Sequence, residues 1–293
     1  MTQALSLPNR DKTVEEAFLP SQAEGRLLAF DSGIGGLGVV AALRRHLPLA
    51  GIDYLADTAL FPYGEQDDAV LSRHIVTLID HAIETIQPDA VVIACNTAST
   101  LALTALREKR PDIPFIGCVP AVRWAARISL SRVIGLLATR ATVRRPYVAA
   151  LHEQYAPDCT LVAYGARYLA DYAEAVFRGE TIDPELMRQE AMGLFGQPNG
   201  ERIDAVALGC THYTFLVEAL RAVSPPHVAW LDPANAVARQ TASVLEARVM
   251  KDMPLKETNR LWFTAPPKDS ALLEEHLLPF GYSHAGLWKP RSL

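Results

Sequence analysis

The chain alternates short, uninterrupted apolar runs with longer segments in which apolar residues recur every three or four positions. Runs such as Leu27 to Phe30 are typical of strands buried on both faces, whereas the longer spacing is typical of amphipathic helices. This alternation predicts an α/β fold with mainly parallel sheets. The predicted strands cover 27–31, 52–56, 90–94, 115–119, 133–137, 160–163, 205–208 and 261–264. The predicted helices cover 38–46, 70–86, 100–109, 124–129, 142–154, 167–178, 184–195, 234–249 and 270–279.

Two segments of the chain are nearly the same. Residues 89–97 read DAVVIACNT and residues 204–212 read DAVALGCTH, with an offset of 115 positions (210 − 95). Each is an aspartate, an apolar run, and a cysteine that polar side chains follow. Because ligands bind outside the carboxyl ends of parallel strands, Cys95 and Cys210 stand where chemistry is expected. We therefore predict two pseudo-symmetric, doubly wound, mainly parallel-sheet domains with the active site in the cleft between them.

The same pattern suggests how the chain divides. After residue 120 the alternation of strands and helices starts over, and the segment from residue 230 onwards is expected to pack on the first half. We predict an N-terminal extension at 1–24, a first domain at 25–118 plus 231–293, and a second domain at 119–230.

Composition narrows the class of protein. With 293 residues, 49% of them hydrophobic, the chain can bury one large core or two medium ones. The net charge is −5 and no basic run is present, which disfavours nucleic acid as a partner. No apolar run approaches the roughly 18 to 20 residues of a membrane span, and the N-terminus does not resemble a signal peptide. We therefore expect a cytoplasmic protein with no membrane partner.

The four cysteines are expected to be free thiols in that compartment. None forms a C-x-x-C pair, and the eight histidines show no zinc-ligand spacing, so no metal site is predicted. Cys118 and Cys159 are expected to be inert core residues. The repeat favours a functional role for Cys95 and Cys210.

A glycine-rich segment at 33–38 fits G-x-G-x-x-G between a predicted strand and a predicted helix. Asp57 follows about 20 positions on, as in a dinucleotide-binding fold. Asp31 opposes that interpretation, because a carboxylate at the strand end would face the pyrophosphate. With Ser32 beside it, this strand end is better suited to an ammonium group. A dinucleotide loop, a plain tight turn and a loop for a small ligand all stay open at this point.

Four motifs in order carry a resemblance to a known family. They are FDSGIGGL at 30–37, PYGE at 62–65, ACNTAS at 94–99 and LGCTHY at 208–213. Together they closely resemble the glutamate racemases of the aspartate/glutamate racemase family, over about residues 28 to 232. The resemblance implies racemisation of L-glutamate to D-glutamate for peptidoglycan, with no cofactor.

The family pattern also implies roles for individual residues. It assigns substrate binding to Asp31, Ser32, Pro62, Tyr63, Gly64, Asn96, Thr97, Thr139, Thr211 and His212. It assigns catalysis to Cys95 on the D-face and Cys210 on the L-face, with Asp31, His212 and Glu174 as candidate proton-relay partners. Two bases on opposite faces, one thiolate and one thiol, can remove and replace the Cα proton without turning the substrate over.

The chain departs from the family pattern at several positions. Thr214 stands where many members have proline, Gly38 stands where a hydroxyl residue is common, and 164–170 lacks the usual Cys-Pro. The last departure weakens the assignment of Glu174, which could instead pair with Arg178 on a solvated helix face. An ordinary interior histidine is likewise the alternative for His212.

Other functions stay open on sequence alone. They are racemisation of another acidic amino acid such as aspartate, an NAD(P)-dependent dehydrogenase, and a two-lobed amino-acid binding protein. The resemblance also suggests a homodimer, and the N-terminal extension suggests regulation by a cell-wall precursor.

Overall fold

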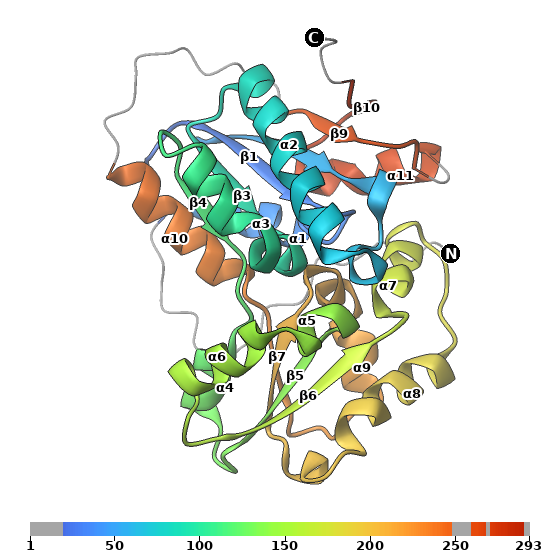
Figure 1. Ribbon diagram of the computed structural model, residues 1–293. Coiled ribbons are helices and arrows are strands. Elements are labelled where there is room, and N and C mark those ends of the chain that lie inside the picture. The colour runs from blue at the N-terminus through green and yellow to red at the C-terminus, as the bar shows by residue number, and fades with distance from the viewer. Residues whose placement is uncertain (1–19, 248–258, 268–269, 290–293) are drawn as a thin grey trace.

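The computed structural model of the chain describes residues 20–247, 259–267 and 270–289, which form two lobes (Figure 1). Each lobe is built on one sheet, and all the strand pairs in the described residues are parallel. The first sheet has the order β10 (Ala285–Leu287), β9 (Leu261–Phe263), β2 (Gly51–Ala56), β1 (Arg26–Asp31), β3 (Ala90–Ile93), β4 (Phe115–Gly117). The second has the order β6 (Thr160–Ala166), β5 (Val133–Thr139), β7 (Ala205–Gly209), β8 (Ala229–Leu231). The predicted fold class is confirmed.

Helices connect and cover these strands. The α-helices are α1 (Leu37–His46), α2 (Asp68–Ile86), α3 (Asn96–Lys109), α4 (Val122–Ile128), α5 (Arg140–Arg144), α6 (Pro146–Tyr155), α7 (Leu169–Phe177), α8 (Pro184–Phe195), α9 (Val217–Ala222), α10 (Ala234–Glu246) and α11 (Ser270–Leu277). Short 3₁₀ turns are η1 (Thr58–Leu60), η2 (Tyr63–Glu65), η3 (Gly200–Arg202), η4 (Thr211–Leu216) and η5 (Leu278–Phe280). Within the described part of the chain, no helix combines the length and the apolar character needed to cross a membrane.

The two sheets share one strand arrangement. The order β2-β1-β3-β4 in the first lobe corresponds to β6-β5-β7-β8 in the second, so β3 and β7 hold equivalent places. In register, Phe30 lies beside Ile93 in the first sheet and Ala138 lies beside Gly209 in the second. Cys95 and Cys210 therefore follow the carboxyl ends of equivalent strands in the two sheets. The domain bounds given above stay a prediction.

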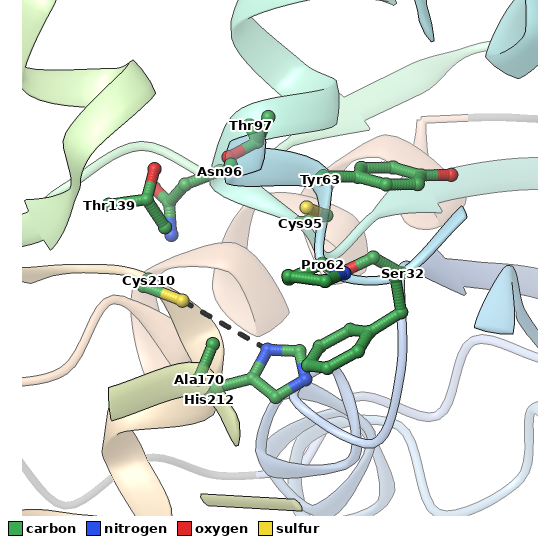
Figure 2. A pocket seen from close by; sticks show the side chains of 12 residues that line it. Ser32, Pro62, Tyr63, Cys95, Asn96, Thr97, Thr139, Ala170, Cys210 and His212 are labelled. Carbon is green, nitrogen blue, oxygen red and sulfur yellow. Dashed lines mark hydrogen bonds between the residues drawn. The ribbon is translucent and has the colours of Figure 1, made fainter. Parts of the chain in front are cut away.

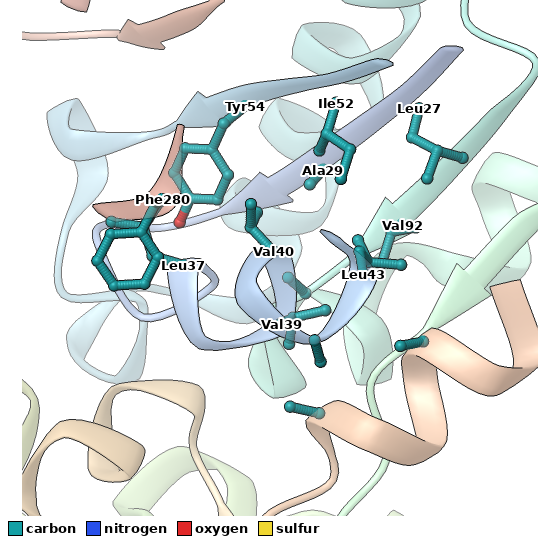
Figure 3. Packing of buried hydrophobic residues seen from close by; sticks show 14 of the residues in the cluster. Leu27, Ala29, Leu37, Val39, Val40, Leu43, Ile52, Tyr54, Val92 and Phe280 are labelled. Atoms are coloured by element: carbon teal, nitrogen blue, oxygen red, sulfur yellow. The ribbon is translucent and has the colours of Figure 1, made fainter. Parts of the chain in front are cut away.

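Both faces of each sheet are buried, which explains why the strands are continuously apolar. In β1, Leu27 and Ala29 pack into a cluster with α1 and α10, whereas Leu28 and Phe30 pack into a cluster with α2 and α3. Figure 3 shows the first of these clusters, with side chains of α1 directed at the sheet. In β7, alternate residues likewise face α7 and α8 on one side and α4 and α6 on the other.

The predicted helix at 142–154 is wrong as a single element. It is split into α5 and α6, with Arg145 extended (φ −78°, ψ 144°) immediately before Pro146. Proline lacks an amide hydrogen and disfavours the helical conformation in the residue before it, so the break falls there. The predicted end of α10 at Val249 lies outside the described residues.

Helix α3 begins earlier than predicted. It starts at Asn96 rather than Thr100, because the Cys95 sulfur accepts the N–H of Ala98 and Cys95 itself caps the helix. The short strands β8 and β10 were not predicted. The turn after Cys210 is the 3₁₀ helix η4, closed by Tyr213 N–H to the Cys210 carbonyl.

Candidate active site

A pocket of about 310 Å³ lies where the carboxyl ends of the two sheets meet (Figure 2). From the first lobe its walls are Ser32, Phe61, Pro62, Tyr63, Gly64, Cys95, Asn96 and Thr97. From the second lobe they are Thr139, Ala170, Cys210 and His212. The two cysteines of the repeat thus reach one pocket from different lobes.

The first thiol sits at the start of α3. Cys95 is 6% exposed, and its Sγ accepts the N–H of Ala98 at 3.5 Å. Burial raises the pKa of the Cys95 thiol well above its usual value, and the charge of Asp31 raises it further, against the opposing N–H of Ala98. Cys95 is therefore a protonated thiol at neutral pH.

The second thiol has an imidazole beside it. Cys210 is 8% exposed, and its Sγ lies 4.0 Å from Nδ1 of His212, the contact drawn as a dashed line in Figure 2. Nε2 of the same ring lies 3.1 Å from Oε1 of Glu174, on α7. That carboxylate oxygen also accepts the N–H of Ile34 at 2.8 Å, so Glu174 is held from both lobes.

These contacts set the charge of His212. Burial alone would lower its pKa, but the contacts with Cys210 and Glu174 and the charge of Asp31 raise the pKa of His212 well above its usual value. A fully buried imidazole is thus cationic at neutral pH. The imidazolium stands between the Cys210 sulfur and the Glu174 carboxylate.

Asp31 lies behind the pocket wall and does not line it. Its carboxylate accepts the hydroxyl of Thr211 at 2.8 Å, the N–H of Gly33 at 3.1 Å and the hydroxyl of Ser32 at 3.2 Å. Burial raises the pKa of Asp31, although His212 and these donors act to lower it. The role of Asp31 towards a ligand stays a prediction; its carboxylate is hydrogen-bonded within the protein, one layer behind the pocket wall.

The glycine-rich segment is shaped by the other lobe. A Cβ added at Gly33 would overlap Oε1 of Glu174, and one added at Gly35 would overlap the ring of His212. Asp57, the acidic residue that a dinucleotide would need for its ribose, is fully buried with its carboxylate already hydrogen-bonded. The glycines therefore make room for the second lobe's side chains, and the geometry argues against the dinucleotide alternative.

Comparison with known proteins agrees with this geometry. Residues 38–241 match the family model described as Asp/Glu/Hydantoin racemase. The chain belongs to this family. It is 58% identical over 224 residues to the glutamate racemase of Granulibacter bethesdensis, covering 76% of this chain and 79% of that one. It is 43% identical over 249 residues to the Brucella canis glutamate racemase, covering 85% and 90%.

The fold of this Asp/Glu racemase family member also matches a solved relative. The crystal structure of Escherichia coli glutamate racemase in complex with L-glutamate and the activator UDP-MurNAc-Ala superposes with a TM-score of 0.85, at 34% sequence identity. The match covers 92% of this chain and 100% of that one. The resemblance inferred from the four motifs is confirmed, and the chain is an isomerase of the racemase class.

Most of the residues that the racemase motifs predicted are brought together. The pocket is lined by Ser32, Pro62, Tyr63, Gly64, Cys95, Asn96, Thr97, Thr139, Cys210 and His212. Asp31, Thr211 and Glu174 form the layer behind it, where Thr211 bonds Asp31 across the lobes. Glu174 combines both interpretations made from sequence, because it contacts His212 and also lies 3.8 Å from Arg178.

Sequence reasoning missed two residues of the racemase pocket. Phe61 precedes the PYG motif, and its ring lies 5.3 Å from that of His212. Ala170 stands on α7 and reads in sequence as an ordinary core alanine. Adjacency to a motif could have flagged Phe61, but no sequence signal marks Ala170.

The other two cysteines lie outside the pocket wall. Cys118 and Cys159 are free and buried and do not line the pocket. In the residues that the structure describes, no group of three or more His, Cys, Asp or Glu side chains could hold a metal ion.

Proposed function

We propose that this protein racemises glutamate without a cofactor, using Cys95 and Cys210 as the two acid–base groups. The observation that carries the proposal is the meeting of two thiols, one from each lobe, at a single pocket of about 310 Å³. The relatives named as glutamate racemases, and the L-glutamate held by the Escherichia coli protein, support glutamate as the substrate.

The surroundings of the thiols suggest which one starts as the base. A cationic His212 at 4.0 Å is the kind of neighbour that stabilises a thiolate. We therefore assign Cys210 the role of base and Cys95 the role of acid towards L-glutamate. With L-glutamate, Cys210 takes the Cα proton, the C–H electron pair stays on the substrate as a carbanion, and the Cys95 thiol supplies a proton from the other face. D-glutamate is converted by the same steps in reverse, starting from the form in which Cys210 holds the proton and Cys95 acts as the base.

Polar groups on the pocket wall are proposed to bind the substrate's charged ends. Both side-chain amide atoms of Asn96 are buried with no hydrogen-bond partner in the described part of the chain, and Asn96 lines the pocket. Such atoms are costly unless a ligand satisfies them. Ser32, Thr97 and Thr139 add hydroxyls to the same wall.

The wider role follows from the same proposal. D-glutamate formed here would serve peptidoglycan synthesis in the cytoplasm. The activator in the Escherichia coli structure supports a similar cell-wall precursor as a regulator of this chain. A homodimer stays a prediction. Growth rescue of a bacterial strain that requires D-glutamate tests the peptidoglycan role, and failure of active protein to rescue would contradict it.

The decisive experiment follows Cα–H loss and optical rotation of L-glutamate in D₂O with purified protein and no added cofactor. We expect both signals to decay. Activity on aspartate but not on glutamate would overturn the substrate assignment but would not contradict the two-thiol proton transfer.

Single cysteine variants test the two-thiol chemistry. Cys95→Ala is expected to exchange the Cα proton of L-glutamate with retention and to leave D-glutamate unexchanged. Cys210→Ala should show the opposite selectivity. Both should lose racemisation, whereas Cys159→Ala is the matched control outside the pocket. Normal racemisation by either pocket variant would exclude the mechanism.

A further inference from the structure

Asp57 is the centre of a buried polar cluster that the proposed chemistry does not use. Its Oδ2 accepts the hydroxyl of Tyr63 at 2.6 Å and lies 2.8 Å from Nε2 of His74. Its Oδ1 accepts the hydroxyl of Thr264 at 2.7 Å. The four residues come from the loop after β2, from η2, from α2 and from the residue after β9. One carboxylate therefore joins four separate segments of the first lobe.

The charges in this cluster support each other. Burial acts to raise the pKa of Asp57, but the hydrogen bonds from His74, Tyr63 and Thr264 outweigh it and lower the pKa. The same contact with Asp57 raises the pKa of His74. Burial and the Asp57 charge raise the pKa of Tyr63 well above its usual value, so its phenol stays protonated and donates. The result is a charged carboxylate with a fixed set of donors.

Tyr63 links this cluster to the pocket. It is buried, lines the pocket and belongs to the same apolar cluster as Cys95. Figure 2 shows its ring beside Cys95 and its hydroxyl directed away from Cys210. Since that hydroxyl is engaged by Asp57, the pocket meets the ring of Tyr63 and not its polar end.

We propose that Asp57, with His74 and Thr264, is a positioning residue that anchors the Tyr63 hydroxyl and so holds the wall formed by 62–64 against Cys95. The inference rests on the proposed function and refines one part of it. Tyr63, predicted to bind substrate, shapes the pocket with its ring. The C-terminal strand β9 thereby reaches the site, because Thr264 also accepts the N–H of Ala59, and Thr58 donates to the carbonyl of Ala265.

A second buried carboxylate in the same region offers a matched control. Asp53 stands within β2, is almost fully buried, and accepts from Nε of Arg26 at 2.8 Å and Nη2 of Arg260 at 3.0 Å. Asp53 is not among the residues that line the pocket, and its side-chain hydrogen bonds in the described part of the chain go to Arg26 and Arg260. Asp53→Asn therefore removes a comparable buried charge without disturbing Tyr63.

The experiment measures kcat, KM and Tm for Asp57→Asn, Tyr63→Phe, their double variant and Asp53→Asn. We expect kcat/KM to fall about 10- to 100-fold in each single variant at 57 and 63, as a small displacement of a reacting group would cause. The double variant should be no worse than the poorer single one, because both break the same contact. Asp53→Asn should lower Tm and leave kcat and KM unchanged.

Two results would overturn the inference. One is a full loss in Tyr63→Phe with wild-type kinetics in Asp57→Asn, which would place the Tyr63 hydroxyl on the substrate. The other is an equal kinetic loss in Asp53→Asn, which would reduce the role of Asp57 to general stability.

A readout independent of glutamate separates this inference from the proposed function. Iodoacetamide labelling of Cys95, followed by peptide mass spectrometry, reports how closely the wall formed by 62–64 packs against Cys95. This readout works even if the wild type does not racemise glutamate. We expect labelling of Cys95 to be several-fold faster in Asp57→Asn than in the wild type or Asp53→Asn. Equal rates in all three proteins would overturn the positioning role.

Discussion

Cys95 and Cys210 follow equivalent strands of two similar sheets, yet their sulfur atoms meet different neighbours. Beside Cys210 the residue two positions on is His212, whose cationic ring contacts the sulfur and Glu174. Beside Cys95 the equivalent position is Thr97, and a different imidazole–carboxylate pair, His74 with Asp57, is joined to the pocket through Tyr63. The comparison teaches that a duplicated framework supplies the position of a thiol, whereas the side chains around it decide which charged groups it meets.

The largest expected effect comes from removing the imidazolium on the Cys210 side. His212→Asn keeps a polar side chain but loses the cation, so we expect kcat to fall about 100-fold or more. The primary isotope effect should rise more with α-deuterated L-glutamate than with the D-form, because the step at Cys210 is slowed. Equal isotope effects for both enantiomers would mean that the two thiols do not differ as described.

A glycine substitution tests whether the first lobe holds His212 in place. In Gly35→Ala the new methyl group would overlap the His212 ring, so we expect a loss of about 1–3 kcal/mol in stability and a clear loss of activity. Gly38→Ala is the matched control in the same segment, since its methyl group would lie 3.4 Å from Thr214 Cγ2, an ordinary contact. Urea unfolding and initial rates measure both effects. Wild-type behaviour of Gly35→Ala would contradict the packing argument.

A smaller effect is expected from Glu174→Gln. The amide keeps a hydrogen bond to His212 but removes the negative charge that raises the pKa of the imidazole. We expect about a tenfold fall in kcat and an alkaline limb of the pH–rate profile that moves to lower pH. Glu180→Gln, an exposed partner of Arg178 close to the end of α7, is the control and should match the wild type. An unmoved profile in Glu174→Gln would argue that Cys210 and Asp31 set the charge of His212 without Glu174.

The smallest effect concerns the imidazole on the Cys95 side. The folded pKa of His74 is raised, so its contribution to stability is complete below about pH 6.5 and is lost as the pH rises through the folded value. The folded pKa of Asp57 is lowered, so its contribution is lost as the pH falls through that value. His74→Gln should therefore cost up to about 1 kcal/mol at neutral pH, a value limited by the partial exposure of His74, and nothing at high pH. Tm measured against pH checks this, and a cost that does not change with pH would refute it.

Local sequence signals predicted the first and last residues of some elements correctly. Helix α8 begins at Pro184 and ends at Phe195 as expected, because Asp183 caps it, proline fits its first turn and Gly196 follows it. The strands before the two cysteines were equally clear, since they are buried on both faces and repeated. Short strands such as β8 and β10 exist only because a neighbouring strand pairs with them, and nothing local marks them.

The residues of the site likewise divide into those that local motifs predict and those that depend on contacts between distant parts of the chain. The motifs placed both thiols and most of the pocket wall, because each motif lies within a few residues of a strand end. The burial of Asp31 depends on Thr211 from the other lobe, and the place of Ala170 depends on how α7 packs. Contacts between residues so far apart in the chain leave no local pattern to find.

The glycines at 33 and 35 have a consequence for how this protein can change. The segment that holds them packs directly against the side chains of Glu174 and His212, which belong to the other half of the chain. The two lobes are therefore not exchangeable parts, even though they share one strand order. A chimera that takes one lobe from a distant relative would have to bring its glycine segment and its opposing side chains together, and substitutions on either side of this contact are expected to be accepted in pairs.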